Sequence, residues 1–108
     1  MSPIDDNVPL RLDYSRRFLD WRDGLRDTRA KARIAARLLA LESGNWGDAK
    51  SVGGGVTELR IHVGPGYRLY LTRRGVSWVL LLCGGDKDSQ ARDIATAQAM
   101  ARELNDGD

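Results

Sequence analysis

The chain has 108 residues, of which 42% are hydrophobic and 30% are charged, and its formal net charge is +2. This length fits one domain, and the hydrophobic fraction excludes a globally disordered chain. The longest apolar run, Val79 to Cys83, is far too short to span a bilayer, and the N-terminus lacks the pattern of a signal peptide. Because the single cysteine cannot form an internal disulfide, we expect a cytoplasmic protein.

The charge is unevenly distributed along the chain. Residues 86–108 hold three basic and six acidic side chains, a balance of −3, which leaves +5 for residues 1–85. Most of the 17 basic side chains are arginines, which bind phosphate groups in a bidentate manner. This asymmetry indicates a polyanionic partner for the first part of the chain and a basic partner near its C-terminus. A solvated, arginine-rich surface is the alternative for any single arginine on a helix.

The first third of the chain predicts a strand and two helices. Residues 1–7 are polar, so we expect a flexible N-terminus there. The alternation in Val8 to Asp13 predicts a short edge strand. Ser15 is a candidate N-cap of a helix that ends at Gly24 and carries one apolar face, formed by Phe18, Trp21 and Leu25.

Asp27 or Thr28 can cap a second helix, which ends at Gly44. Its buried stripe consists of Ile34, Leu38 and Leu41, and its outer face carries Arg29, Lys31, Arg33 and Arg37. We expect the two helices to form a hairpin. The segment Asn45 to Gly55 contains four glycines and predicts a loop. This loop lacks the lysine-serine ending and the following helix of a nucleotide-binding loop.

Three strands and a helix make up the remainder. Val56 to Val63 and Tyr67 to Arg73 alternate and are joined by a GPG turn, and Val76 to Cys83 is apolar on both faces and therefore the most buried strand. A last helix begins after Asp88 or Ser89, with an inner face of Ile94, Ala97, Ala101 and Leu104.

The predicted order is strand, helix, helix, strand, strand, strand, helix, and it indicates an α+β domain over residues 8–105, followed by a flexible C-terminus at 106–108. We expect the helices to cover one face of an antiparallel sheet and to leave the other face open. The polar positions of the two hairpin strands must share that open face. These positions are Glu58, Arg60, His62, Arg68 and Tyr70.

Four short motifs carry a family resemblance: ELRI, GPGYR, CGGDK and SQARDI. With this spacing they resemble the RelE/HigB-type toxins of bacterial type II toxin–antitoxin modules, in particular the phage-related addiction module killer proteins. The resemblance covers about Val8 to Leu104. It implies a compact α+β fold and a cognate antitoxin, a small helix-turn-helix protein encoded next to the toxin, through which alone the toxin contacts operator DNA.

Many members of that family cleave mRNA on the ribosome, which arrests translation and growth, whereas the related ParE-like toxins poison DNA gyrase. For this chain, three hypotheses stay open: a ribosome-dependent mRNA endonuclease (an mRNA interferase), a gyrase poison, and a catalytically weak member that acts through its antitoxin and the operator. The basic residues on the expected open face favour the endonuclease.

The resemblance implies a catalytic set of three basic residues. Arg68 in GPGYR stands where RelE-type toxins carry a phosphate-stabilising arginine, Arg60 lies on the same face, and Lys87 matches the basic residue after the last strand. A lysine among arginines loses its proton more readily and can act as a base. The alternatives are an ion pair between Arg68 and Glu58 and a solvated loop position for Lys87. With one histidine and no Cys/His cluster, we expect no metal site and no cofactor.

Four further residues are candidates for RNA contact: Lys50, His62, Tyr70 and Gln90. Tyr70 can stack on a base or fill the strand, and His62 can exchange protons near neutral pH. Lys50 belongs to the rim of the expected site, and Gln90 either orients a phosphate or caps the last helix. Glu58 departs from the RelE pattern, which has a basic residue there, and no aromatic residue follows the GGDK loop.

Overall fold

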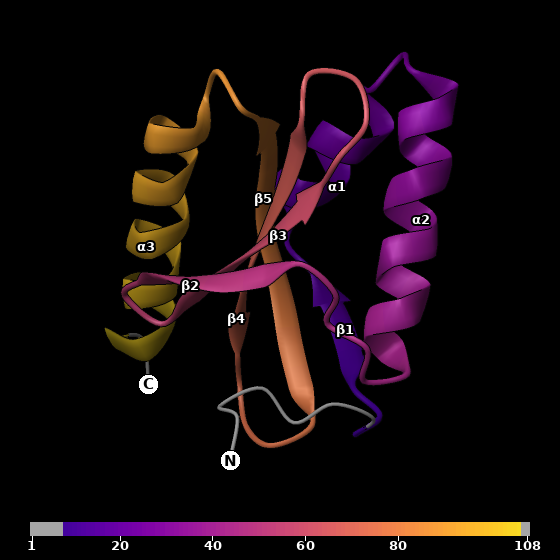
Figure 1. Ribbon diagram of the computed structural model, residues 1–108. Coiled ribbons are helices and arrows are strands. Elements are labelled where there is room, and N and C mark those ends of the chain that lie inside the picture. The colour runs from indigo at the N-terminus through magenta and orange to yellow at the C-terminus, as the bar shows by residue number, and fades with distance from the viewer. Residues whose placement is uncertain (1–7, 107–108) are drawn as a thin grey trace.

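The computed structural model describes residues 8–106 of the chain, shown in Figure 1. In chain order the elements are β1 (Arg11–Tyr14), α1 (Arg16–Asp23), α2 (Thr28–Glu42), β2 (Ala49–Gly53), β3 (Val56–Ile61), β4 (Tyr67–Arg73), β5 (Trp78–Asp86) and α3 (Gln90–Asp106). The predicted α+β fold and element order are confirmed, with β2 as an additional strand. Of the segments that we expected to be flexible, 1–7 and 107–108 lie outside the described residues, whereas Asp106 ends α3.

The five strands form one sheet in the order β1-β5-β4-β3-β2. The pairs β2–β3, β3–β4 and β4–β5 are antiparallel, whereas β1 is parallel to β5 with Arg11 opposite Trp78 and Tyr14 opposite Leu81. β1 is thus an edge strand, as its short alternating pattern predicts. It places the beginning of the domain beside its last strand.

Side-chain caps set the starts of the first two helices. The Ser15 hydroxyl accepts a hydrogen bond from the Phe18 backbone N–H at 3.0 Å, and Asp27 Oδ1 accepts one from the Ala30 N–H at 3.1 Å. Both predicted caps are confirmed, and α1 gives way to Gly24 as expected. The Ser15 hydroxyl also donates to the carbonyl oxygen of Leu82 at 2.6 Å, which ties α1 to β5.

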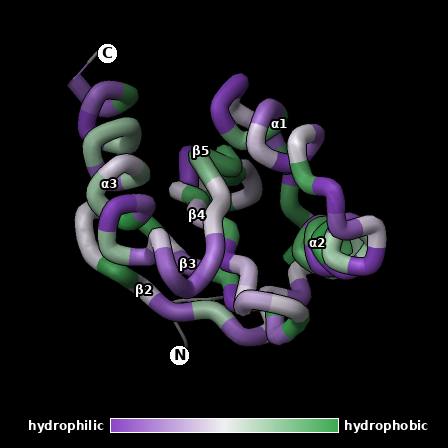
Figure 2. The backbone as a smooth tube through the Cα atoms, turned by 90° about the horizontal axis from the view of Figure 1, so that it is seen from above, coloured by the Kyte–Doolittle hydropathy of each residue, from purple (hydrophilic) through white to green (hydrophobic). Residues whose placement is uncertain are grey.

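The helical hairpin α1–α2 packs on one face of the sheet. Its core contains Phe18, Ile34, Leu38 and Leu41 from the helices and Leu59, Leu69, Leu71 and Leu81 from the strands. α3 packs on the opposite face, as Figure 2 shows from above. The second core consists of Val56, Tyr70, Leu82, Cys83, Ala97 and Ala101.

The expectation of one open sheet face is therefore wrong. The face that we took to be polar carries apolar side chains at Val56 and Leu82, and these need a cover. The small side chains of Ala97 and Ala101 allow α3 to approach them closely. The end of this face next to the β3–β4 turn carries the charged side chains Glu58, Arg60 and Arg68, and this end holds the candidate site.

The expected loop over 45–55 contains the strand β2. Gly53, Gly54 and Gly55 all have positive φ, at 89°, 64° and 77°, so the glycines form the turn of a hairpin between β2 and β3. The last strand also begins later than expected, because Val76 is 79% exposed and β5 starts at Trp78. Among residues 8–106, no helix is both long and apolar enough to cross a membrane.

Candidate functional site

A cavity of about 220 Å³ lies at the end of the β3–β4 hairpin, beside the loop that follows β5. It is lined by Arg60, Ile61, His62, Gly66, Tyr67, Arg68 and Lys87. The three basic residues that the sequence predicts as a catalytic set thus line one cavity, which we call the basic pocket. His62, predicted as an RNA-contact residue, lies at the same place.

The sheet register positions the two arginines. Arg60 on β3 lies directly opposite Arg68 on β4, so both side chains leave the same face. On its other side Arg68 faces Gly85 of β5, which has no side chain, and Lys87 follows two residues later. Gly66 lies in the turn with φ of 83°, and a Cβ atom there would lie 3.5 Å from Arg68 Nη1 and 3.7 Å from Lys87 Cβ. The basic pocket is therefore formed where the β3–β4 turn, at Gly66, meets the loop after β5, which carries Lys87.

A buried carboxylate lies beneath the arginines. Glu58 is fully buried, and its Oε1 accepts a hydrogen bond from Arg60 Nε at 2.9 Å. Its Oε2 accepts a second hydrogen bond from Gln90 Nε2 at 2.8 Å and forms an ion pair with Arg68 Nε at 3.6 Å. The pairing of Arg68 with Glu58, one of the two alternatives for Arg68, is present in the structure. The expected position of Glu58 on an open surface is wrong, because α3 covers it.

The charged groups of this cluster stabilise one another's ionised forms. Burial alone would raise the pKa of Glu58, but the hydrogen bonds from Arg60 and Gln90 and the charge of Arg68 outweigh it and hold the pKa below its usual range. The hydrogen bond with Glu58 in turn raises the pKa of Arg60. The carboxylate is therefore ionised at neutral pH.

The three cations of the basic pocket differ in exposure. The side chain of Arg68 is 13% exposed and that of Arg60 is 31% exposed, whereas Lys87 lies in the exposed loop after β5. Arg68 Nη1 also donates a hydrogen bond to the Gly66 carbonyl oxygen at 3.1 Å. The two arginines are thus held by Glu58, and Lys87 is the most exposed of the three cations.

Two of the predicted RNA contacts have structural partners instead. Tyr70 is fully buried beneath α3, so its ring cannot stack on a base, and this prediction is wrong. Burial and the charge of Glu58 raise the pKa of the Tyr70 hydroxyl. Gln90 begins α3, and its side-chain amide is used by Glu58. It therefore orients the carboxylate.

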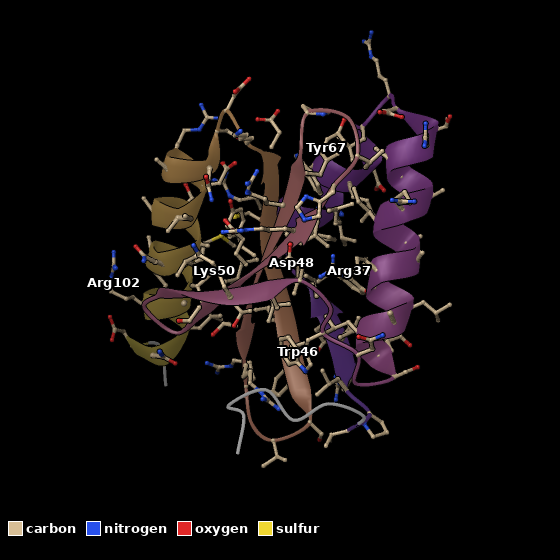
Figure 3. The ribbon with its side chains drawn as sticks, in the orientation of Figure 1. Arg37, Trp46, Asp48, Lys50, Tyr67 and Arg102 are labelled. Atoms are coloured by element: carbon tan, nitrogen blue, oxygen red, sulfur yellow. The ribbon has the colours of Figure 1, made fainter. Side chains whose placement is uncertain are left out.

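A second cavity of about 390 Å³ adjoins the basic pocket and shares three lining residues with it, Arg60, Ile61 and His62. The His62 ring binds Asp48 Oδ2 at 2.7 Å. Arg37 donates hydrogen bonds to the carbonyl oxygens of Arg60, Trp46 and Asp48, and Figure 3 shows its side chain reaching from α2 toward Asp48. The prediction that Arg37 lies on an outer, solvated face is wrong, because it anchors the segment before β2.

Lys50 lies outside both cavities. It is exposed on β2 opposite Glu58 in the register, and in Figure 3 it lies nearer to α3 than to α2. A third hollow, of about 900 Å³, lies between α1, the end of β5 and α3. Its lining mixes two arginines, Arg17 and Arg92, with three aspartates, Asp20, Asp86 and Asp93. A phosphate chain is disfavoured there, so the basic pocket is the better anion site.

Sequence reasoning offered the pairing of Glu58 with Arg68 as an alternative, but it missed that Glu58 is buried and also binds Arg60 and Gln90. The available signal was a carboxylate at an alternate strand position two residues from Arg60, on the face that also carries Arg68. Such a carboxylate between two arginines is the expected partner for both. The burial of Glu58 and its hydrogen bond from Gln90 depend on the position of α3, which the local sequence pattern does not give.

The fold and the site define a small α+β protein with a basic pocket formed by two arginines and a lysine. No family model matches the chain. A Haemophilus influenzae protein described as an uncharacterized protein is 51% identical to it over 87 residues, which are 81% of this chain and 88% of that protein. The chain belongs to the same family as this H. influenzae protein. The description of this relative names no function, so the functional argument rests on the chemistry of the site.

Proposed function

We propose that this protein is the toxin of a type II toxin–antitoxin module of the RelE/HigB kind, and that it acts as a metal-independent endoribonuclease on mRNA at the ribosome. The observation that carries this proposal is the presence of Arg60, Arg68 and Lys87 around one cavity of about 220 Å³. Guanidinium and ammonium groups at one place suit a phosphodiester. The motifs that resemble the toxin family contribute all three of these residues, Arg60 in ELRI, Arg68 in GPGYR and Lys87 in CGGDK.

RNA cleavage through the substrate's own 2′-OH requires three things of a protein. A group must take the proton of the 2′-OH, another must protonate the departing 5′ oxygen, and positive charge must stabilise the phosphate in the transition state. Arg60 and Arg68 supply the charge, since arginine stays protonated in proteins. Lys87, His62 and Tyr67 line the basic pocket and are the candidates for the two proton-transfer roles, and neither role needs a metal ion or a cofactor.

The antitoxin in this proposal is a small helix-turn-helix protein encoded beside the toxin. The exposed cations at the basic pocket attract an acidic segment of that partner, which blocks the site, and operator DNA is bound through the antitoxin. A second surface for the partner is the outer face of α2, where Arg29 and Arg33 are exposed. Hydrogen exchange on the complex tests both, because one of the two surfaces should gain protection.

The test of the function is induction of the protein alone in growing cells, with translation and DNA supercoiling followed separately. We expect growth arrest, loss of translation, and transcripts cut within coding regions. The variant Lys87→Ala, which leaves Glu58 paired with both Arg60 and Arg68, is the matched control and should arrest growth weakly or not at all. Intact transcripts with relaxed or broken DNA would assign the protein to the gyrase poisons, and unchanged growth would assign it to the regulatory members.

A further inference from the structure

Glu58 contacts side chains from three different elements at the basic pocket. It binds Arg60 of its own strand β3, Arg68 of β4 and Gln90 at the start of α3. It is fully buried and is not among the residues that line the pocket. Any role in the chemistry proposed above is therefore exerted through its partners, since substrate cannot reach it.

The two arginines need a counter-charge to stay side by side. Arg60 and Arg68 are direct cross-strand partners, and like charges in such pairs repel each other. The carboxylate lies within 2.9 Å of Arg60 Nε and 3.6 Å of Arg68 Nε. Each guanidinium has five N–H donors, so contacts with Glu58 through Nε leave the terminal nitrogens of Arg60, and Nη2 of Arg68 beside the Nη1 bond to Gly66, available for other partners.

The same carboxylate reaches the segment that carries the lysine. Gln90 donates to Glu58 through its side chain, and its backbone N–H donates to the Lys87 carbonyl oxygen at 3.4 Å. The turn between them is closed by Asp86, whose Oδ1 accepts from the backbone N–H groups of Asp88 and Ser89 at 2.9 Å and 3.1 Å. A rigid turn thus joins the carboxylate's third partner to Lys87.

We infer that Glu58 is a positioning residue that sets the geometry of the phosphate site, by holding both arginines at their Nε side and by fixing the Lys87 turn through Gln90. This inference rests on the proposed function for its effect on cleavage. Its geometric part concerns anion binding alone and is independent of that function. A carboxylate next to a phosphodiester is unfavourable by charge, and its burial under the arginines explains how the site tolerates it.

The experiment compares the wild type with Glu58→Gln, which has nearly the same shape and no charge, and with Glu103→Gln on the exposed side of α3 as the matched control. Three quantities are measured: the ¹H–¹⁵N resonances of the arginine Nε–H groups, binding of a short RNA blocked by 2′-O-methyl groups, and cleavage of an unblocked mRNA on translating ribosomes.

For Glu58→Gln we expect shifted Nε–H resonances of Arg60 and Arg68 and a turnover number reduced on the order of tenfold to a hundredfold. Binding of the blocked RNA should be unchanged or stronger, because a negative charge has been removed near the phosphates. Loss of turnover with retained binding separates positioning from simple charge effects. Glu103→Gln should match the wild type in all three measurements.

Wild-type turnover and unshifted Nε–H resonances in folded Glu58→Gln would overturn the inference. If that variant does not fold, Gln90→Ala decides, since it removes only the link to α3: shifted backbone resonances around Lys87 support the inference, and an unchanged spectrum overturns it. If the wild type itself cleaves no RNA, the proposed function fails, but the Nε–H resonances titrated with inorganic phosphate still test the positioning by Glu58.

Discussion

Arg68, a proposed phosphate ligand, is also a structural residue, because its guanidinium is one of two charged partners of the buried Glu58. On the open surface that the sequence suggests, replacing it with alanine would change stability by no more than about 0.5 kcal/mol. In the structure, the substitution leaves a buried carboxylate with less compensation.

We therefore predict that Arg68→Ala abolishes toxicity and also lowers the free energy of unfolding by about 1–3 kcal/mol. Urea denaturation measures the stability, and growth after induction measures the toxicity. Arg29→Ala on the exposed face of α2 is the control and should change neither. A fully stable Arg68→Ala protein would contradict the coupling between the arginine and Glu58.

The pKa of Glu58, held below its usual range, predicts a defined pH dependence. A carboxyl group with a lowered pKa in the folded state contributes stability above its unfolded pKa, about 4.3, and loses this contribution as the pH falls through the folded value. The difference in unfolding free energy between the wild type and Glu58→Gln should be largest above about pH 5 and shrink in more acidic solution. A difference that stays constant from pH 7 to pH 3 would show that the carboxylate gains nothing from its partners.

Among the secondary-structure elements, β5 lies between the two cores, and it contains two adjacent glycines, Gly84 and Gly85. A Cβ atom on Gly84 would overlap the ring of Trp21 on α1, and one on Gly85 would overlap the carboxylate of Asp93 on α3. The absence of side chains lets helices approach this strand closely on both faces. The turn that carries Lys87 comes directly after these two glycines, so the glycines also determine where Lys87 lies at the edge of the basic pocket.

We predict that Gly84→Ala destabilises the protein by about 1–3 kcal/mol, because the methyl group forces the Trp21 ring out of its position. Thermal unfolding gives the change in stability, and tryptophan fluorescence reports the displaced ring. Ser51→Ala on exposed β2 is the control. An unchanged unfolding midpoint would mean that α1 can move away from β5 without cost.

Much of the arrangement of helices and strands could be predicted from the sequence. The caps Ser15 and Asp27 were readable because capping is a local interaction between residues three apart, and the alternation of β3 and β4 correctly placed Arg60 and Arg68 on one face. Alternation tells which side chains share a face, but what covers that face depends on contacts between distant segments. For that reason Tyr70 and Glu58 were expected to be exposed, and the position of α3 buries both.

For the whole molecule, the formal net charge is only +2, although three cations, Arg60, Arg68 and Lys87, lie together at the basic pocket. Binding of RNA should therefore depend on local charge and show a modest salt dependence. For single strands the logarithm of affinity falls by about 0.7 per phosphate contact for each tenfold increase in salt, so three cations predict a slope of about −2.

Titrations of 2′-O-methyl RNA at several salt concentrations should give this slope, and Lys87→Ala should reduce its magnitude by about 0.7. Lys50→Ala is the matched control, because Lys50 lies on β2 outside both cavities, and it should leave the slope unchanged. A slope near zero in the wild type would remove the basic pocket as the RNA site.

The parallel pairing of β1 with β5 has a consequence for synthesis of the protein. Ser15 donates a hydrogen bond to Leu82, which is 67 residues further along the chain. The edge strand β1 therefore cannot pair with β5 until most of the chain has been synthesised. Pairings between such distant segments form slowly, because a long loop must close first. β5 is also the strand on which both helical layers rest, and Gln90, which completes the shell of Glu58, emerges from the ribosome after it. A nascent chain that stops before β5 has neither a closed sheet nor an assembled pocket, so the activity that we propose is withheld from the ribosome that makes the protein until synthesis is almost complete.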